Sequence, residues 1–242
     1  MKLSARAAGS ELMDEPELDP EDLAAALRDL RGVNRWLGGW RVLRRCMAAL
    51  LARLPPGHYR VLDVGTGSAD LPLRLASWAR HRGKHLDILA TDVHPQTVEL
   101  ARVNTGGAPD VKVEAADALA LPYSDGEFDF ALCSTALHHF EEQDAVQALR
   151  EMNRVARYGM VINDLRRSGL ALLGARLLAA TAWRGSRFTR HDGPLSVRRA
   201  FTAAELRRLA RAARLPNACV RTHLPFRLSL VVDRTPGRPG TP

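Results

Sequence analysis

Residues 61–72 read VLDVGTGSADLP, a pattern that predicts a buried strand, a glycine-rich turn and the start of a helix. The first four residues are mostly apolar and β-favouring. Gly65 and Gly67 reach backbone angles that other residues avoid, and they let a ligand approach the main chain closely. Pro72 suits a first helical turn, where its missing N–H costs nothing. Open α/β sheets bind ligands at such turns, at the carboxyl ends of their strands.

The residues around the two glycines narrow the type of ligand. A phosphate-binding loop would carry a lysine, and a dinucleotide fingerprint would carry a third glycine where this chain has Asp70. What remains is Asp63-x-Gly65-x-Gly67, and an acid at that position suits a cationic ligand without phosphates. The pattern resembles motif I of the class I S-adenosylmethionine (SAM)-dependent methyltransferases. The resemblance implies that Asp63, Gly65 and Gly67 bind SAM.

A second acid follows the next predicted strand, residues 86–92, which ends at Asp92. Doubly wound nucleotide-binding folds use an acid at this point to accept hydrogen bonds from ribose hydroxyls. We therefore predict that Asp92 and the adjacent Val93 belong to the cofactor site. The alternative is that Asp92 caps the helix expected near residues 96–104.

The third predicted strand, residues 111–115, leads to Asp117 and Ala118. In the methyltransferase family that the chain resembles, an acid here bonds the adenine amino group, and the next backbone N–H reaches the ring. A carboxylate beside a free N–H can form hydrogen bonds with an adenine edge, which offers both a donor and an acceptor. The alternative is a plain Asx turn.

The fourth predicted strand, residues 128–133, is followed by STALHHF at residues 134–140. Ser134 is a further predicted cofactor contact. The chain lacks the Asn/Asp-Pro-Pro-aromatic motif that methylation of exocyclic base nitrogens would need. The Leu-His-His-Phe run instead resembles small-molecule methyltransferases of the ubiquinone/menaquinone-biosynthesis type. Residues 196–202 and 34–39 resemble methyltransferases found beside bacterial polyketide genes, which implies phenolic, pyrone or quinone-like acceptors.

The expected fold class is α/β, a Rossmann-like seven-stranded sheet with an antiparallel last strand. The strands and their helices form a class I methyltransferase domain over residues 58–233. Residues 16–57 contain two helices, separated by a glycine- and tryptophan-rich turn at 34–40, that act either as a lid or as a packing layer. After the fifth strand, residues 166–200 form a substrate-cap insertion, an apolar helix (168–183) followed by an arginine-rich loop (184–200). Residues 1–15 are expected to be disordered and 234–242 to form a flexible tail.

The composition of the 242-residue chain limits the kinds of binding partner and cellular compartment that we expect. Its formal net charge of +8 comes almost entirely from arginines spread along the sequence, so nucleic-acid binding is not favoured. The three cysteines lack metal-ligand spacing and fit a reducing cytoplasm. No apolar run marks a signal peptide, and residues 168–183 are too short to cross a bilayer, although peripheral membrane contact stays open. The oligomeric state is left open.

The reaction implied by the resemblance is in-line methyl transfer from SAM to the oxygen or carbon of a small apolar or aromatic acceptor. The protein must align the two reactants and deprotonate the acceptor. Histidine suits that work, and the candidate bases are His138, His139, His191 and His223, with His139 and His191 preferred by position. No catalytic metal is expected. The alternatives are an RNA methyltransferase and a non-catalytic SAM-binding regulatory protein.

Overall fold

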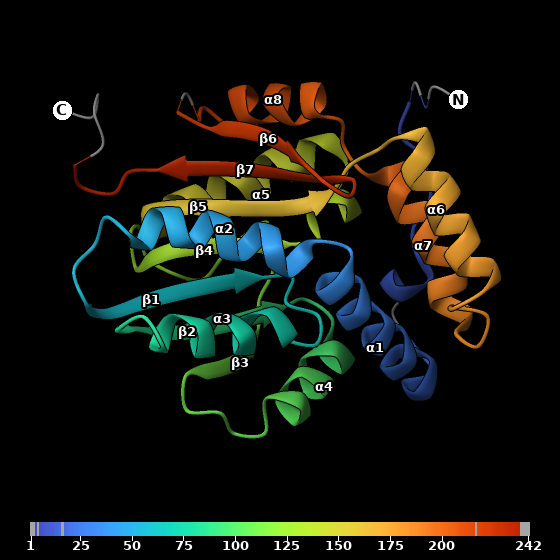
Figure 1. The fold of residues 1–242 in the computed structure, drawn as a ribbon, viewed down its shortest axis with the longest axis horizontal. Coiled ribbons are helices and arrows are strands. Elements are labelled where there is room, and N and C mark those ends of the chain that lie inside the picture. The colour runs from blue at the N-terminus through green and yellow to red at the C-terminus, as the bar shows by residue number, and fades with distance from the viewer. Residues whose placement is uncertain (1–2, 4, 16, 216, 238–242) are drawn as a thin grey trace.

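The computed structural model describes residues 3, 5–15, 17–215 and 217–237. Within these residues seven strands form one sheet: β1 (Gly57–Val64), β2 (Lys84–Asp92), β3 (Val111–Ala115), β4 (Phe128–Ser134), β5 (Ala156–Leu165), β6 (Cys219–His223) and β7 (Arg227–Asp233). Their order is β3-β2-β1-β4-β5-β7-β6, and β7 runs in the direction opposite to the other six strands (Figure 1). The predicted Rossmann-like sheet with an antiparallel last strand is therefore confirmed.

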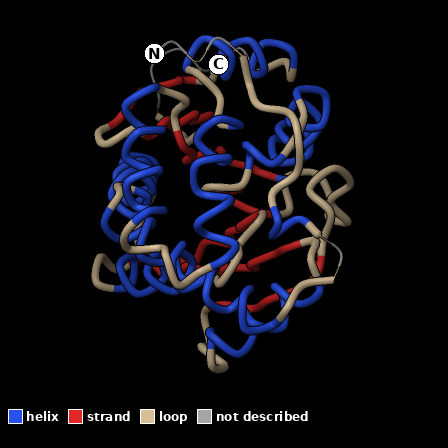
Figure 2. Tube along the Cα trace, turned by 90° about the vertical axis from the view of Figure 1, so that its right-hand side faces the viewer, coloured by secondary structure: helices blue, strands red, loops and turns tan. Residues whose placement is uncertain are grey.

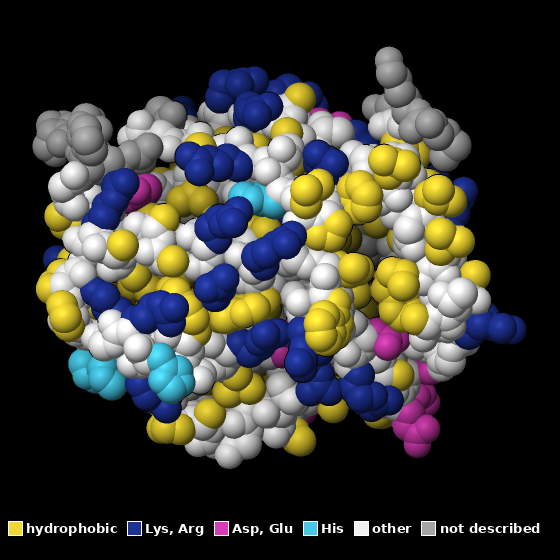
Figure 3. Space-filling view, in the orientation of Figure 1, with side chains coloured by type: hydrophobic (Ala, Val, Ile, Leu, Met, Phe, Trp, Pro, Cys, Tyr) yellow, Lys and Arg dark blue, Asp and Glu magenta, His cyan; other side chains and the backbone are white. Residues whose placement is uncertain are grey.

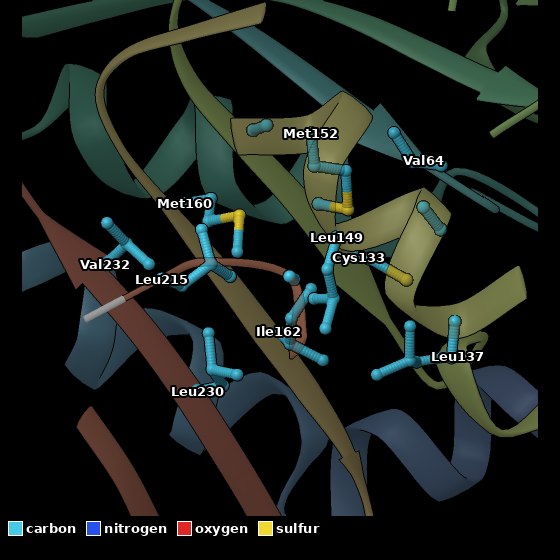
Figure 4. Close-up of a cluster of buried hydrophobic side chains, with 14 of the residues drawn as sticks. Val64, Cys133, Leu137, Leu149, Met152, Met160, Ile162, Leu215, Leu230 and Val232 are labelled. Atoms are coloured by element: carbon cyan, nitrogen blue, oxygen red, sulfur yellow. The ribbon is translucent and has the colours of Figure 1, made fainter. Parts of the chain in front are cut away.

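Helices cover both faces and one edge of this sheet. They are α1 (Pro20–Trp36), α2 (Gly39–Leu51), α3 (Asp70–Arg80), α4 (Pro95–Thr105), α5 (Glu142–Val155), α6 (Gly169–Ala180), α7 (Arg187–Arg199) and α8 (Ala203–Ala212), with short 3-10 turns η1 (Leu12–Asp14) and η2 (Leu137–His139). Strand side chains alternate between two cores. Val61 packs with α2 and α3, whereas Leu62 packs with α5 and α8. Figure 4 shows the second core, where buried leucines, methionines and Cys133 interlock.

The topology determines where a ligand can bind. β1 pairs with β2 on one side and β4 on the other, so the strand order reverses beside β1. The carboxyl ends of strands at such a switch point leave a crevice for ligands. Helices α1, α6 and α7 lie at this edge of the sheet, in front of the strand ends in the side view (Figures 1 and 2).

Two predicted helix boundaries in the N-terminal region differ from the structure. Asp19 caps α1 as expected, with its carboxylate accepting from two backbone amides. The helix then continues through Gly32 and Asn34, where the sequence predicted a turn, and only residues 37–38 separate it from α2. Asn34 is buried, and its side chain bonds Asp70 and Thr135. These long-range contacts stabilise a helical position that local propensity disfavours.

The insertion after β5 contains two helices, because the expected arginine-rich loop at 184–200 folds as α7 for most of its length. Ser186 caps the helix, and Pro194 lies inside it. Its buried positions recur at helical spacing. Two of them, Phe188 and Val197, are apolar, and three, Asp192, Ser196 and Arg199, are polar or charged. A search for apolar periodicity misses such a helix, because its inner face is partly polar.

The segment before α1 also differs from the disordered N-terminus that the sequence predicted. Glu11 is only 3% exposed, and the Ala7 N–H donates to the Arg198 carbonyl. Arg6 donates to the carbonyls of Arg199, His138 and Phe140. At the other end, residues 238–242 of the predicted tail lie outside the described residues, while Thr235 is buried. Residues 5–15 are thus part of the packed structure, whereas residues 1, 2 and 4 of the predicted disordered segment lie outside the described residues.

The surface carries basic side chains over much of the face in Figure 3, with apolar side chains gathered over α6. The exposed side chains of α6 include Leu170, Leu173 and Leu177. No helix in the described part of the chain combines the length and apolarity needed to cross a bilayer. The predicted peripheral membrane contact stays a prediction.

Candidate active site

The glycine-rich turn after β1 opens into a cavity of about 570 Å³ at the switch point of the sheet. Gly65 has a φ of +68°, and a Cβ there would lie 2.7 Å from the Cβ of Ala136. Only glycine therefore fits this turn without displacing a neighbour. Six of the eight residues predicted to contact the cofactor line this cavity: Gly65, Gly67, Asp92, Val93, Asp117 and Ala118. The volume lies within the range of small-molecule and cofactor pockets.

Asp92 connects the end of β2 to the glycine turn. Its Oδ2 accepts a hydrogen bond from the Gly67 N–H over 3.0 Å, and its Oδ1 accepts one from the His94 N–H over 3.1 Å. Burial raises the pKa of Asp92, and these two amides oppose the shift. The N-cap position of α4 is His94, so Asp92 does not cap that helix. Its carboxylate is instead held rigidly at the cavity wall.

Asp117 and Ala118 follow β3 in a loop at the same cavity. The Asp117 side chain is exposed and accepts from the Leu119 N–H over 2.9 Å, which is the Asx turn considered as the alternative. The same carboxylate lies beside the buried Ala118 at the cavity wall. The turn and an adenine contact are compatible, because one carboxylate oxygen can accept more than one hydrogen bond.

Two predicted cofactor residues, Asp63 and Ser134, do not line the cavity. Asp63 is 3% exposed, and within the described residues its Oδ1 has no hydrogen-bond partner. Burial, with the charges of Asp70 and Asp92, raises the pKa of Asp63 to about 7. Ser134 accepts a hydrogen bond from the amide of Asn163. Asp63 therefore lies behind the glycine turn with one unsatisfied oxygen and does not line the cavity.

A second cavity of about 210 Å³ adjoins the first. Its walls are mostly apolar and come from α1, α6, α7 and the turn between α6 and α7. They include Leu30, Val33, Ala175, Leu178, Trp183 and Val197. Met13, Leu30, Thr135 and His139 line both cavities, so the two spaces meet at these side chains. The predicted cap insertion thus forms one wall of a small apolar chamber beside the predicted cofactor cavity.

Polar groups at this junction come from segments far apart in the sequence. His138 is 1% exposed, and its Nδ1 lies 2.7 Å from Oδ1 of Asp164, near the end of β5. The His139 Nδ1 lies 2.8 Å from Oδ1 of Asp14, in η1. Both rings turn Nε2 toward Glu11, at 3.6 Å for His138 and 3.7 Å for His139.

The carboxylates determine the charge of His139. Burial lowers the pKa of this ring, but Glu11 and Asp14 outweigh that effect and raise the pKa to about 9. The ring therefore carries a proton at neutral pH and does not act there as a free general base. For Asp164, burial raises the pKa and the adjacent His138 lowers it, with a net decrease that keeps the carboxylate ionised. The junction therefore favours a positive charge.

The other histidine candidates lie away from this junction. His191, preferred from the sequence together with His139, bonds Asp192 and has a side chain 53% exposed; it lines neither cavity. His223 bonds Ser229 on β7, among the edge strands. Only His138 and His139 of the four are brought together.

Several residues at the junction were not identified from the sequence. Glu11 and Asp14 fall in a segment without a periodic pattern, and Thr135 looks like an ordinary loop residue. Arg227 is fully buried, lines the apolar cavity and donates to the Thr135 hydroxyl over 2.7 Å. Burial lowers the pKa of Arg227 to about 10. Only Asp164 could have been found from the sequence, because an acid near the end of a predicted strand indicates a site residue.

Known proteins resemble the part of the chain that contains the glycine turn. Residues 61–159 match a family model described as a methyltransferase domain. A demethylmenaquinone methyltransferase of Deinococcus radiodurans is 38% identical over 125 residues, 51% of this chain and 46% of that protein. A ubiquinone/menaquinone biosynthesis C-methyltransferase of Rickettsia akari is 31% identical over 108 residues, 43% of each protein. The chain thus spans less than half the length of these relatives.

Solved structures share the fold at low sequence identity. A SAM-dependent methyltransferase from Aquifex aeolicus superposes with a TM-score of 0.60 at 18% identity, covering 90% of this chain and 100% of that one. An O-methyltransferase described as putative, from Nostoc punctiforme, gives 0.63 at 17% identity, covering 95% and 64%. These likenesses concern the fold alone.

Proposed function

We propose that this chain is a class I SAM-dependent methyltransferase that transfers a methyl group from SAM to a small, ring-bearing apolar acceptor. One observation carries the proposal: an apolar cavity of about 210 Å³ meets the glycine-turn cavity at Met13, Leu30, Thr135 and His139. Two reactants bound in the two spaces would have adjacent ends, which is what an in-line transfer requires.

SAM, when bound, supplies a methyl group on a positively charged sulfur. The glycine turn and Asp92 line the space for its nucleoside part, and the unsatisfied Asp63 carboxylate lies behind them. Gly65 lies so close to Ala136 that a side chain at this position would clash with it. These residues bind and orient the donor, so that the acceptor cavity is left for the second reactant.

The acceptor cavity supports a phenol, an enol or a quinone-like ring as substrate. Its walls are apolar, and its polar groups cluster at the junction. A protonated His139 there stabilises an anionic oxygen on the acceptor, because opposite charges attract strongly where water is scarce. A phenolate or enolate can react at oxygen or at the neighbouring carbon, so O- and C-methylation both remain within the proposal. The relative from Rickettsia akari is named as a C-methyltransferase, which favours the carbon.

The test uses SAM labelled on its methyl group with a deproteinised extract of the host. The products are separated into organic-soluble and RNA fractions. We expect label in the organic fraction, lost in Asp92→Ala and kept in Asp87→Ala, an exposed residue on the same strand. Label in RNA would establish the RNA alternative. Tight SAM binding without any labelled product would favour the regulatory alternative.

A further inference from the structure

The junction between the two cavities contains three side chains arranged as metal ligands. Among the described residues, Glu11, His138 and His139 form a group whose candidate ligand atoms all lie within 4.8 Å of one another. Each histidine faces a different oxygen of the Glu11 carboxylate, Oε1 at 3.6 Å and Oε2 at 3.7 Å. An ion about 2.1 Å from every ligand would set these atoms roughly 3.0–3.4 Å apart. Small side-chain movements would therefore close the site around an ion.

The outer partners of the two histidines point to the same use. Asp164 lies 2.7 Å from Nδ1 of His138, and Asp14 lies 2.8 Å from Nδ1 of His139. A carboxylate at Nδ1 holds the ring with one proton there and points Nε2 away from it, so that an ion can replace any proton on Nε2. The Nε2 atoms of both rings face the same carboxylate. The Ser196 hydroxyl donates to Glu11 over 2.8 Å and fixes its orientation in turn.

The three candidate ligands face a cavity, which distinguishes them from a closed structural metal site. Glu11, His138 and His139 all line the apolar cavity. Three protein ligands leave coordination positions unfilled, and a catalytic metal keeps such positions open toward its substrate. Two imidazoles and one carboxylate suit a divalent ion of the zinc, iron or manganese type, whereas magnesium and calcium prefer oxygen ligands.

We infer that Glu11, His138 and His139 form a binding site for one divalent transition-metal ion, with zinc as the probe. The site lies at the acceptor end of the junction, where a bound dication would replace the His139 proton and hold an oxygen of the acceptor in its anionic form. This role rests on the proposed methyl transfer, whereas the binding of the ion does not. The site also revises the sequence expectation that no metal is involved.

Metal binding is measured directly, without SAM or acceptor, by titrating chelator-treated protein with ZnCl₂ in a calorimeter. We expect one zinc per chain, with affinity at least tenfold lower in Glu11→Gln and in His139→Gln. Glu15→Gln is the matched control for the first variant, because Glu15 is exposed and outside the group. His85→Gln controls for adventitious uptake, because His85 stacks on His58 at the surface. Both controls should bind zinc like the wild type.

The outcomes separate the alternatives. Absence of saturable zinc binding overturns the inference, and so does binding that survives both Glu11→Gln and His139→Gln or disappears in His85→Gln. Thermal melting of each variant identifies any that fails to fold. His139→Gln keeps the test decisive if Glu11→Gln does not fold, because the His139 side chain is 28% exposed and less enclosed. Failure of methyl transfer with intact zinc binding would count against the proposed function alone.

Discussion

The backbone N–H of Gly67 donates a hydrogen bond to the Asp92 carboxylate over 3.0 Å, joining the glycine turn after β1 to the end of β2. The two walls of the glycine-turn cavity that Gly67 and Asp92 form are thereby fixed relative to each other before any ligand binds. A site organised in advance loses less conformational entropy on binding. Asp92 therefore has two roles, as a cavity wall and as the anchor of the turn.

Asp92→Ala should weaken SAM binding by tenfold or more, which corresponds to at least about 1.4 kcal/mol. The carboxylate would no longer bond a ribose, and the Gly67 amide would lose its acceptor. Calorimetric titration with SAM measures the effect, with Asp87→Ala as the control on the same strand. An unchanged affinity would show that Asp92 supports the fold and not the cofactor.

Stability should depend on the ionisation of Asp63. Its pKa is about 7 in the folded protein against an ordinary value of 3.8, so the folded state keeps the proton that the unfolded state releases. The contribution of Asp63 is fully present below pH 4 and is lost as the pH rises through 7. Between pH 5 and pH 8 this loss is roughly 2–3 kcal/mol of unfolding free energy.

Asp63→Asn should remove that dependence, because an amide does not ionise. In denaturant titrations of the cofactor-free protein, the variant should gain stability relative to the wild type between pH 5 and pH 8. Asp144→Asn, an exposed change on α5, should keep the wild-type dependence. Parallel pH curves for wild type and Asp63→Asn would refute the raised pKa.

Filling the apolar cavity should separate donor binding from turnover. Ala175 lies on α6 and lines this cavity but not the larger one. Ala175→Phe should reduce labelled product by at least tenfold and leave SAM affinity within about twofold of wild type, because the ring would occupy acceptor space. Ala180→Phe, at an exposed position of the same helix, is the control. Equal losses of SAM affinity and product would mean that the two cavities are not separate binding sites.

Arg6 should hold the N-terminal segment over the junction. It donates to the carbonyls of Arg199, His138 and Phe140, and its guanidinium lies 4.0 Å from the Phe201 ring centre. Hydrogen bonds from a charged group contribute about 1.5–3 kcal/mol each. Arg6→Ala should therefore raise local opening of residues 5–15 by at least tenfold, measured by hydrogen exchange.

Arg28→Ala is the control for that measurement, because Arg28 is exposed on α1. It should leave exchange in residues 5–15 unchanged. Slow exchange of this segment in Arg6→Ala would mean that η1 is held by its other contacts, such as the Leu12 and Met13 amides bonded to Asp192.

Six of the eight residues predicted to contact the cofactor line the glycine-turn cavity, and short stretches of sequence were enough to place them there. Strand, turn and helix signals fall within a dozen residues around Gly65, and Asp92 and Asp117 each follow directly after an apolar strand. In a parallel sheet such residues necessarily meet at one edge, because the carboxyl ends of the strands lie together. Local pattern and topology are then enough to assign a residue to the cavity.

The acceptor side depended on contacts that no local pattern encodes. Glu11 and His139 are separated by 128 residues, and Asp164 is brought to His138 only because β5 lies beside β4. Helix α7 was missed because its buried face is partly polar, and α1 was predicted too short because Asn34 finds its partners in other elements. The sequence by itself determined the sheet and the glycine-turn cavity, since both follow from periodicity and chain order. Only the tertiary structure decided which charges surround the two histidines, since that pairing follows from packing between distant segments.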